Sequence, residues 1–160
     1  MSTRSKQAWR RAEDMLVGGL NPRSTVPMMT LKKGYKALIA EAEAQIETIS
    51  VEEAKRMLGA PGVIFVDLRD PRELDKEGRI PGAVHCPRGM LEFWIDPESP
   101  YARPVFQQDA KFVFFCGAGW RSALATKVAQ EMGLSPVAHI GGGFGAWKAA
   151  DGAIEATKPK

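Results

Sequence analysis

A cysteine at the end of an apolar run, followed by a glycine-containing loop, is the feature of this chain best suited to chemistry. Cys116 closes the run that starts at Lys111, and residues 117–122 read Gly-Ala-Gly-Trp-Arg-Ser before a helical pattern. Backbone N–H groups in such a loop can converge on one sulfur atom, and the positive end of the helix dipole lies beside them. Arg121 adds a full positive charge. These features favour a nucleophilic thiolate over an inert thiol.

Two glycines give this loop its backbone freedom. Gly117 and Gly119 can adopt angles that are closed to residues with side chains, which lets the peptide approach a sulfur atom or an anion closely. An inert core cysteine would need neither these glycines nor the arginine that follows them. The spacing therefore favours a functional site over a structural cysteine.

Strand and helix patterns alternate around the loop. Strands are predicted at 63–66, 83–85, 112–115 and 137–140, and helices at 51–58, 72–77, 89–94, 122–132 and 144–150. Ser50 and Glu53 form a capping-box pattern at the first of these helices. The alternation predicts an α/β fold, a three-layer sandwich whose mostly parallel central sheet is flanked by helices. Ligand sites in such sheets lie beyond the carboxyl ends of strands, which is where Cys116 falls.

The overall composition is that of one globular domain. The chain has 160 residues, of which 44% are hydrophobic and 26% charged, enough to bury a core. No apolar run is long enough for a membrane-spanning helix, and the first residues lack the apolar stretch of a secretory signal. A cytoplasmic location is therefore expected. Two cysteines and two histidines, with no Cys-x-x-Cys pair, support neither a disulfide framework nor a metal site.

Positive charge gathers at the start of the chain. Residues 1–36 hold eight Lys or Arg against two acidic residues, which leaves 14 basic and 17 acidic residues in 37–160. Residues 1–30 are expected to form a basic, flexible segment. Within it, four apolar residues fall at helical spacing: Trp9, Ala12, Met15 and Leu16.

Residues 31–45 are expected to add an amphipathic helical extension. Its apolar stripe consists of Leu31, Tyr35, Leu38, Ile39, Ala42 and Ile46. Docking of this stripe on the main domain is favoured over pairing with a second copy in a homodimer, and both remain open at this stage.

Four motifs follow one another in a set order. They are Asp67-Leu68-Arg69-Asp70 with Glu73, then residues 78–83, residues 116–122 and residues 142–147. Together they resemble the rhodanese family, single-domain sulfurtransferases that carry a persulfide on one cysteine. The resemblance covers residues 46–150 and implies a catalytic domain at 46–152, followed by a tail at 153–160.

The resemblance implies a reaction and its partners. A thiosulfate sulfurtransferase of this family takes a sulfane sulfur from thiosulfate or a similar small anionic donor. It passes that sulfur to a thiol, to cyanide or to a protein thiol. No cofactor or metal is implied, since sulfur is both nucleophile and carrier, and no nucleic acid or membrane partner is expected.

The resemblance also assigns residues to the site. Cys116 is the nucleophile, and Arg121 either gives electrostatic help or ties the loop to Asp67 or another carboxylate. Arg69 and Arg88 are candidate substrate-binding residues, with a structural ion pair and a solvated surface position as their respective alternatives. Asp67 is expected to be structural. The expected substrate cradle consists of Gly117, Ala118, Gly119, Trp120 and Ser122, with Trp120 at the pocket mouth.

Loop length separates sulfur transfer from phosphate chemistry. Arg121 lies five positions after Cys116, which gives the six-residue loop typical of sulfurtransferases. The dual-specificity phosphatases of the same fold place arginine one position later, because a longer loop wraps the oxygens of a phosphoryl group. A phosphatase or arsenate reductase is therefore disfavoured. A persulfide-sensing or redox-sensing interaction module is the alternative from another class.

Other residues give weaker signals. Cys86 could resolve a Cys116 persulfide into a disulfide, but a small buried residue beside a strand is favoured. His85 and His139 lie in apolar strand contexts, and a thiolate that is already ionised needs no base. The proline-containing connection 96–108 is a candidate lid over the pocket mouth that would select the donor.

Overall fold

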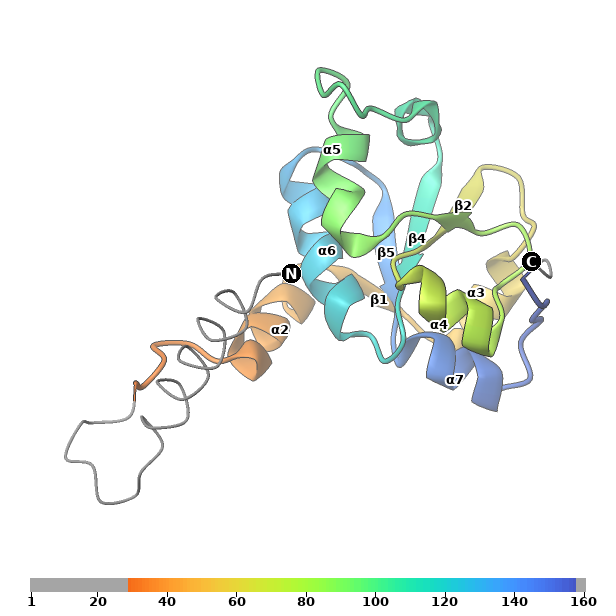
Figure 1. The fold of residues 1–160 in the computed structure, drawn as a ribbon, viewed down its shortest axis with the longest axis horizontal. Coiled ribbons are helices and arrows are strands. Elements are labelled where there is room, and N and C mark those ends of the chain that lie inside the picture. The colour runs from red at the N-terminus through yellow and green to blue at the C-terminus, as the bar shows by residue number, and fades with distance from the viewer. Residues whose placement is uncertain (1–28, 158–160) are drawn as a thin grey trace, which may run out of the picture. The chain divides into compact units, whose positions relative to one another are not determined.

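A parallel sheet organises residues 29–157, which are the residues that the computed structural model describes (Figure 1). Its strands are β1 (Glu47–Ile49), β2 (Val63–Asp67), β3 (Val84–His85), β4 (Lys111–Phe115) and β5 (Val137–Ile140). They lie in the order β1-β5-β4-β2-β3, and every neighbouring pair is parallel. The predicted α/β class is confirmed.

The register of the central strands brings two predicted site residues to one edge of the sheet. In the β2–β4 pair, Val63 lies opposite Lys111 and Asp67 lies opposite Phe115. The Leu68 N–H continues this ladder by donating to the Phe115 carbonyl oxygen at 2.9 Å. Asp67 and Cys116 therefore emerge together at the carboxyl ends of neighbouring strands.

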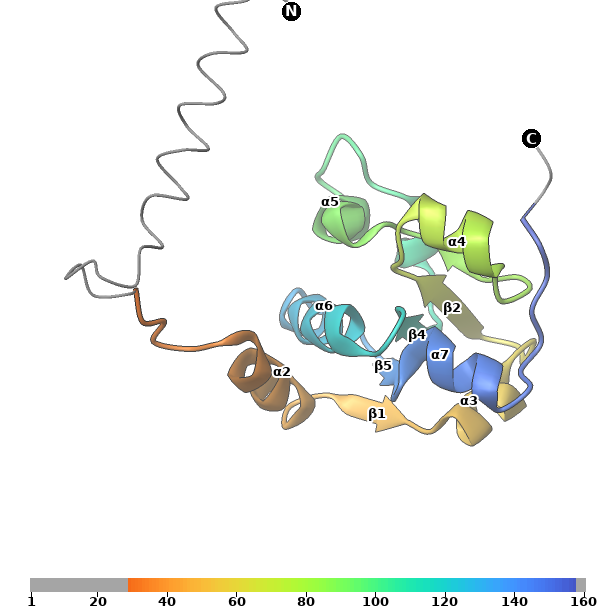
Figure 2. The same ribbon diagram turned by 60° about the horizontal axis from the view of Figure 1, so that its bottom comes forward.

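Helices cover both faces of the sheet (Figure 2). They are α2 (Tyr35–Glu43), α3 (Val51–Met57), α4 (Pro71–Glu77), α5 (Leu91–Ile95), α6 (Trp120–Glu131) and α7 (Gly143–Ala149), with 3₁₀ turns η1 (Arg88–Met90) and η2 (Pro104–Gln107). Side chains of β4 alternate between the faces. Phe112 and Phe114 pack with α5 and α6, whereas Val113 and Phe115 pack with α3 and α7. Each buried phenylalanine contributes roughly 1.5–3 kcal/mol of hydrophobic stabilisation.

Polar caps fix the starts of two helices. The Ser50 hydroxyl accepts a hydrogen bond from the Glu53 N–H at 3.1 Å, as the sequence pattern predicts. At α4, Asp70 and Glu73 form a complete capping box, and Pro71 occupies the first helical position. This second box places the Glu73 carboxylate beside the cysteine loop.

The helical extension lies along α6. Ala42 of α2 is fully buried, and the Gln130 side-chain amide donates to the Gln45 carbonyl oxygen at 2.8 Å. Tyr35 and Leu38 of the predicted apolar stripe stay exposed. The helix is shorter than predicted and ends at Glu43, because the chain must turn to enter β1, a strand that the sequence pattern did not reveal. The predicted helical spacing at 9–16 lies outside the described residues.

No helix within residues 29–157 combines the length and apolar character that crossing a membrane requires.

Candidate active site

Two backbone N–H groups point at the sulfur of Cys116. The residue follows β4 directly and is only 1% exposed. Its Sγ accepts hydrogen bonds from the Gly119 N–H at 3.2 Å and the Ser122 N–H at 3.4 Å. The Ser122 hydroxyl oxygen lies 3.6 Å from the same atom. N–H groups aimed at a sulfur favour its ionised form.

The loop adopts this shape because α6 begins within it. Gly119 is the N-cap of α6 and has φ +98°, a left-handed conformation that favours glycine. Trp120 and Arg121 already follow helical geometry. Among the loop residues 117–122, the N–H groups that bond the sulfur are therefore those of Gly119 and Ser122. The N–H groups of the first helical turn have no acceptor within the helix, which leaves them available to an anion at the loop.

The turn before α7 supports the loop from behind. The Phe144 N–H donates to the Cys116 carbonyl oxygen at 2.7 Å, and the Gly145 N–H donates to the Gly117 carbonyl oxygen at 3.0 Å. Gly143 has φ +60°, and a Cβ at this position would collide with the Cys116 carbonyl oxygen. The close approach of these two backbones therefore requires glycine.

Arg121 is tied to a carboxylate, as one of its two predicted roles requires. Its terminal nitrogens donate to the Glu73 carboxylate at 2.8 and 2.9 Å. The partner is Glu73 rather than Asp67. Hydrogen bonding to Arg121 lowers the pKa of Glu73 to about 2. The same bonds raise the pKa of Arg121, and the nearby Cys116 sulfur raises it further.

Arg69 forms the structural ion pair that was the alternative to substrate binding, and its contact with a substrate stays a prediction. Its guanidinium is fully buried and donates to the Asp67 carboxylate, with the shortest distance 2.8 Å. It also donates to the Gly78 carbonyl oxygen at 2.9 Å and lies 3.9 Å from the centroid of the Phe144 ring. Buried Asp67 needs a cation beside it, and Arg69 fills that role.

Two candidate contact residues lie near the surface. Arg88 is partly buried and pairs with Glu92 at 2.6 Å, while its backbone N–H bonds the Leu68 carbonyl oxygen beyond β2. It is thus paired rather than simply solvated, and its contact with a substrate stays a prediction. Trp120 is 55% exposed at the start of α6 and contacts Tyr35 of α2, with ring centroids 5.1 Å apart and the ring planes tilted by 42°.

A buried histidine belongs to the site, although no sequence motif predicted it there. His139 of β5 bonds the Ser122 hydroxyl through Nδ1 at 2.9 Å and the Thr48 hydroxyl through Nε2 at 3.0 Å. Burial lowers the pKa of His139 to about 4, so the ring is neutral near pH 7. Because Ser122 touches Cys116, His139 is connected to the nucleophile through one side chain.

The remaining cysteine and histidine have structural surroundings. Cys86 is fully buried, and burial raises the pKa of its thiol to about 12. Its backbone N–H donates to the Asp67 carbonyl oxygen at 2.9 Å. The His85 ring bonds the Arg69 carbonyl oxygen at 2.7 Å. Both residues therefore hold the connections beside β2 in place.

The connection 96–108 lies at the wrong end of the domain to cover the site, which corrects its prediction as a lid. Phe106 is buried, and Gln107 donates to the Ile95 carbonyl oxygen at 3.0 Å. The segment shares a hollow with residues 132–134, beyond the carboxyl end of α6, whereas the cysteine loop opens the amino end (Figure 1). The 12 residues of α6 separate the two by about 18 Å.

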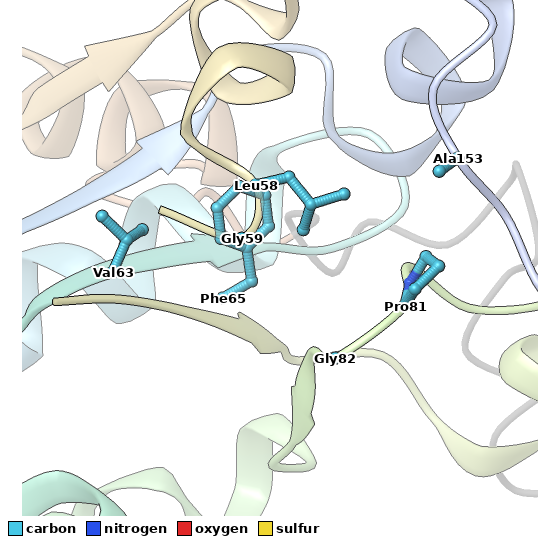
Figure 3. Close-up of a pocket in the computed structure, with 7 residues that line it drawn as sticks. All are labelled: Leu58, Gly59, Val63, Phe65, Pro81, Gly82 and Ala153. Carbon is cyan, nitrogen blue, oxygen red and sulfur yellow. The ribbon is translucent and has the colours of Figure 1, made fainter. Parts of the chain in front are cut away.

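The hollow drawn in Figure 3 is also separate from Cys116. It has a volume of about 450 Å³ and is lined by Leu58, Gly59, Val63, Phe65, Pro81, Gly82 and Ala153. Val63 begins β2, so this hollow lies toward the amino ends of the strands. Its lining offers no nucleophile and no charged side chain.

Comparison with known proteins gives the family. The model of the rhodanese-like domain matches residues 50–150, and the chain belongs to this family. A human thiosulfate:glutathione sulfurtransferase is 28% identical over 106 residues, covering 62% of this chain and 91% of that protein. A thiosulfate:glutathione sulfurtransferase of Saccharomyces cerevisiae is 31% identical over 111 residues, covering 65% and 79%. The chain is thus of the sulfurtransferase type.

A solved structure resembles the chain over most of its length. It is described as a protein of unknown function and possible tyrosine phosphatase from Rhodopseudomonas palustris CGA009. The two are 57% identical with a TM-score of 0.78, and the match covers 81% of this chain and 99% of that one.

Proposed function

We propose that this protein transfers a sulfane sulfur through a persulfide on Cys116. The observation behind the proposal is the pair of N–H groups, from Gly119 and Ser122, that lie 3.2 and 3.4 Å from Sγ. The Cys116 thiolate attacks the outer sulfur of thiosulfate or a similar donor, and a new S–S bond forms. The S–S bond of thiosulfate breaks, and sulfite leaves with the electron pair.

The second half of the reaction regenerates the thiolate. An acceptor thiolate, or cyanide, attacks the terminal sulfur of the persulfide, and Cys116 leaves with the electron pair of the S–S bond. First-turn N–H groups of α6, at Trp120 and Arg121, are suited to hold the negative terminal sulfur before this step. No cofactor is required by either step.

A small thiol is the acceptor that the comparisons favour. The human and yeast relatives are both thiosulfate:glutathione sulfurtransferases, whose names give a sulfur donor and a thiol acceptor. We extend both partners to this chain as part of the proposal. Trp120 and Ala118 are exposed on the loop, where an incoming thiol would contact them.

Phosphatase activity is the second candidate, because of the description given to the Rhodopseudomonas neighbour. Two features of this chain argue against it. The loop from Cys116 to Arg121 is one residue shorter than the phosphatase loop described above, and both terminal nitrogens of Arg121 are already bonded to Glu73. The guanidinium would have to leave that carboxylate to bind phosphoryl oxygens bidentately.

Turnover with paired substrates tests the proposal. We expect thiosulfate with cyanide to give thiocyanate, and thiosulfate with glutathione to give glutathione persulfide and sulfite. Cys116→Ser should abolish both products. Sulfur uptake without turnover would support the sensing module instead. Phosphate release from an aryl phosphate, with no sulfur product, would support the phosphatase.

A further inference from the structure

A line of hydrogen-bonding side chains runs from the nucleophile to the surface of the domain. The Cys116 sulfur lies 3.6 Å from the Ser122 hydroxyl oxygen, which lies 2.9 Å from His139 Nδ1. His139 Nε2 lies 3.0 Å from the Thr48 hydroxyl oxygen. The first three residues are at most 1% exposed, whereas Thr48 is exposed.

Sheet order assembles this line from distant parts of the sequence. His139 lies opposite Thr48 in the β1–β5 pair and opposite Phe114 in the β4–β5 pair. β5 lies between β1 and β4 in the sheet, which sets the imidazole between β1 and the cysteine loop that follows β4. Ser122 reaches the ring from the first turn of α6.

The hydrogen bonds along this line can be donated in either of two directions, away from the sulfur or toward it. With a Cys116 thiol, the S–H donates to Ser122, the Ser122 O–H donates to Nδ1, and the Nε2–H donates to Thr48. With a thiolate, Thr48 donates to Nε2, the Nδ1–H donates to Ser122, and the Ser122 O–H donates to the sulfur. A neutral imidazole has one donor and one acceptor nitrogen, so the ring fits either direction as one tautomer or the other.

We propose that His139 is a positioning residue which, held by Thr48, turns the Ser122 hydroxyl toward the Cys116 sulfur and so stabilises its thiolate. The change of direction conserves protons. Each group passes one proton to the next, the thiol loses one, and the Thr48 hydroxyl delivers one to solvent. The inference rests on the proposed function and deepens it, because it concerns a residue that positions a partner of the nucleophile in that reaction.

The imidazole ring of His139 is neutral. Burial keeps His139 unprotonated at neutral pH, so only one ring nitrogen carries a hydrogen, and whether that nitrogen is Nδ1 or Nε2 decides which way the Ser122 hydroxyl points. Ser122 from α6 and Thr48 from β1 are the groups that hydrogen-bond the ring. The charged group near the sulfur is Arg121, paired with Glu73 of α4.

Alkylation of Cys116 by iodoacetamide, followed by intact mass, tests the inference without any sulfur transfer. In His139→Asn, the amide N–H takes the place of Nδ1–H and can still donate to Ser122. In His139→Gln, the amide falls near Nε2 and leaves Ser122 without that partner. We expect His139→Gln to react about tenfold more slowly at neutral pH, with the acidic limb of its pH profile moved to higher pH. His139→Asn should stay within about threefold of the wild type.

A second pair of variants, at Thr48, tests the inference even if substitutions at the buried His139 prevent folding. Thr48 is exposed, so Thr48→Val and Thr48→Ser should fold alike. Thr48→Val is expected to slow alkylation about threefold, and Thr48→Ser to restore it. Equal rates and pH profiles for folded His139→Gln and the wild type would overturn the inference. Equal rates for Thr48→Val and Thr48→Ser would overturn it if the His139 variants do not fold. Failure of the wild type to take up sulfur would instead overturn the proposed function.

Discussion

Both oxygens of the Glu73 carboxylate accept hydrogen bonds from Arg121, at 2.8 and 2.9 Å. One of these oxygens also accepts from the Asp70 N–H at 2.8 Å, which closes the capping box of α4. A single side chain thus joins the start of α4 to the loop that surrounds Cys116. The position of the guanidinium beside the sulfur depends on a helix from another part of the chain.

Removal of this carboxylate should cost both stability and activity. We expect Glu73→Ala to lose about 1–2 kcal/mol of unfolding free energy, because a helix cap and a partly exposed ion pair are lost together. Sulfur transfer should fall about tenfold as Arg121 loses its anchor. Glu131→Ala, which breaks the exposed pair with Lys127, is the matched control and should cost under about 0.5 kcal/mol. Similar results in urea denaturation for the two variants would contradict this role of Glu73.

The ion pair between Glu73 and Arg121 also predicts how the unfolding free energy depends on pH. The pKa of Glu73 is lowered from 4.5 to about 2 in the folded protein, so its contribution is fully present above pH 4.5 and disappears as pH falls toward 2. Unfolding free energies measured across this range should show the wild type and Glu73→Gln converging at the acidic end. A constant difference between them down to pH 2 would show that the ionised carboxylate is not the source of the stabilisation.

The close approach of the turn before α7 to the cysteine loop gives a steric prediction. In Gly143→Ala, the new Cβ meets the Cys116 carbonyl oxygen in a left-handed conformation, and we expect a loss above about 3 kcal/mol together with most activity. Gly62→Ala is the matched control, since Gly62 has φ +74° but open space around it, and should cost about 1–2 kcal/mol. Thermal denaturation compares the two. Equal losses of stability in the two variants would mean that the left-handed backbone angle accounts for the whole cost and that the contact with the Cys116 carbonyl oxygen adds nothing.

The tilted ring contact between Tyr35 and Trp120 should couple the helical extension to the site. Both rings are about half exposed, and their centroids lie 5.1 Å apart. A double-mutant cycle with Tyr35→Ala and Trp120→Ala should give a coupling of about 0.5–1.5 kcal/mol in unfolding free energy. Additive effects of the two substitutions would show that the contact between these rings does not help to hold α2 in place.

Much of the fold was predictable because its signals are local. The apolar runs of β2, β4 and β5 and the caps of α3 and α4 lie in short stretches of sequence. The strand Glu47–Ile49 gave no such signal, since it has three residues of which two are exposed. Its position at the edge of the sheet is decided by pairing with β5.

The site was predictable only as far as its local motif extends. The loop 116–122 is continuous in sequence, and its spacing indicates a nucleophilic cysteine. The partners of Arg121 and His139 are set by tertiary contacts, so the roles of these two residues could not be chosen beforehand. Thr48 and His139 are 91 positions apart and meet only because β1 pairs with β5.

The mass of Cys116 after exposure to thiosulfate tests the central claim most directly. Intact and peptide mass spectrometry of the full chain should show one added sulfur atom on Cys116, absent from Cys116→Ser and removed by cyanide or glutathione. Glu131→Ala should take up sulfur as the wild type does. A folded protein whose Cys116 reacts with iodoacetamide but never gains sulfur from thiosulfate or another sulfane donor would contradict the persulfide mechanism.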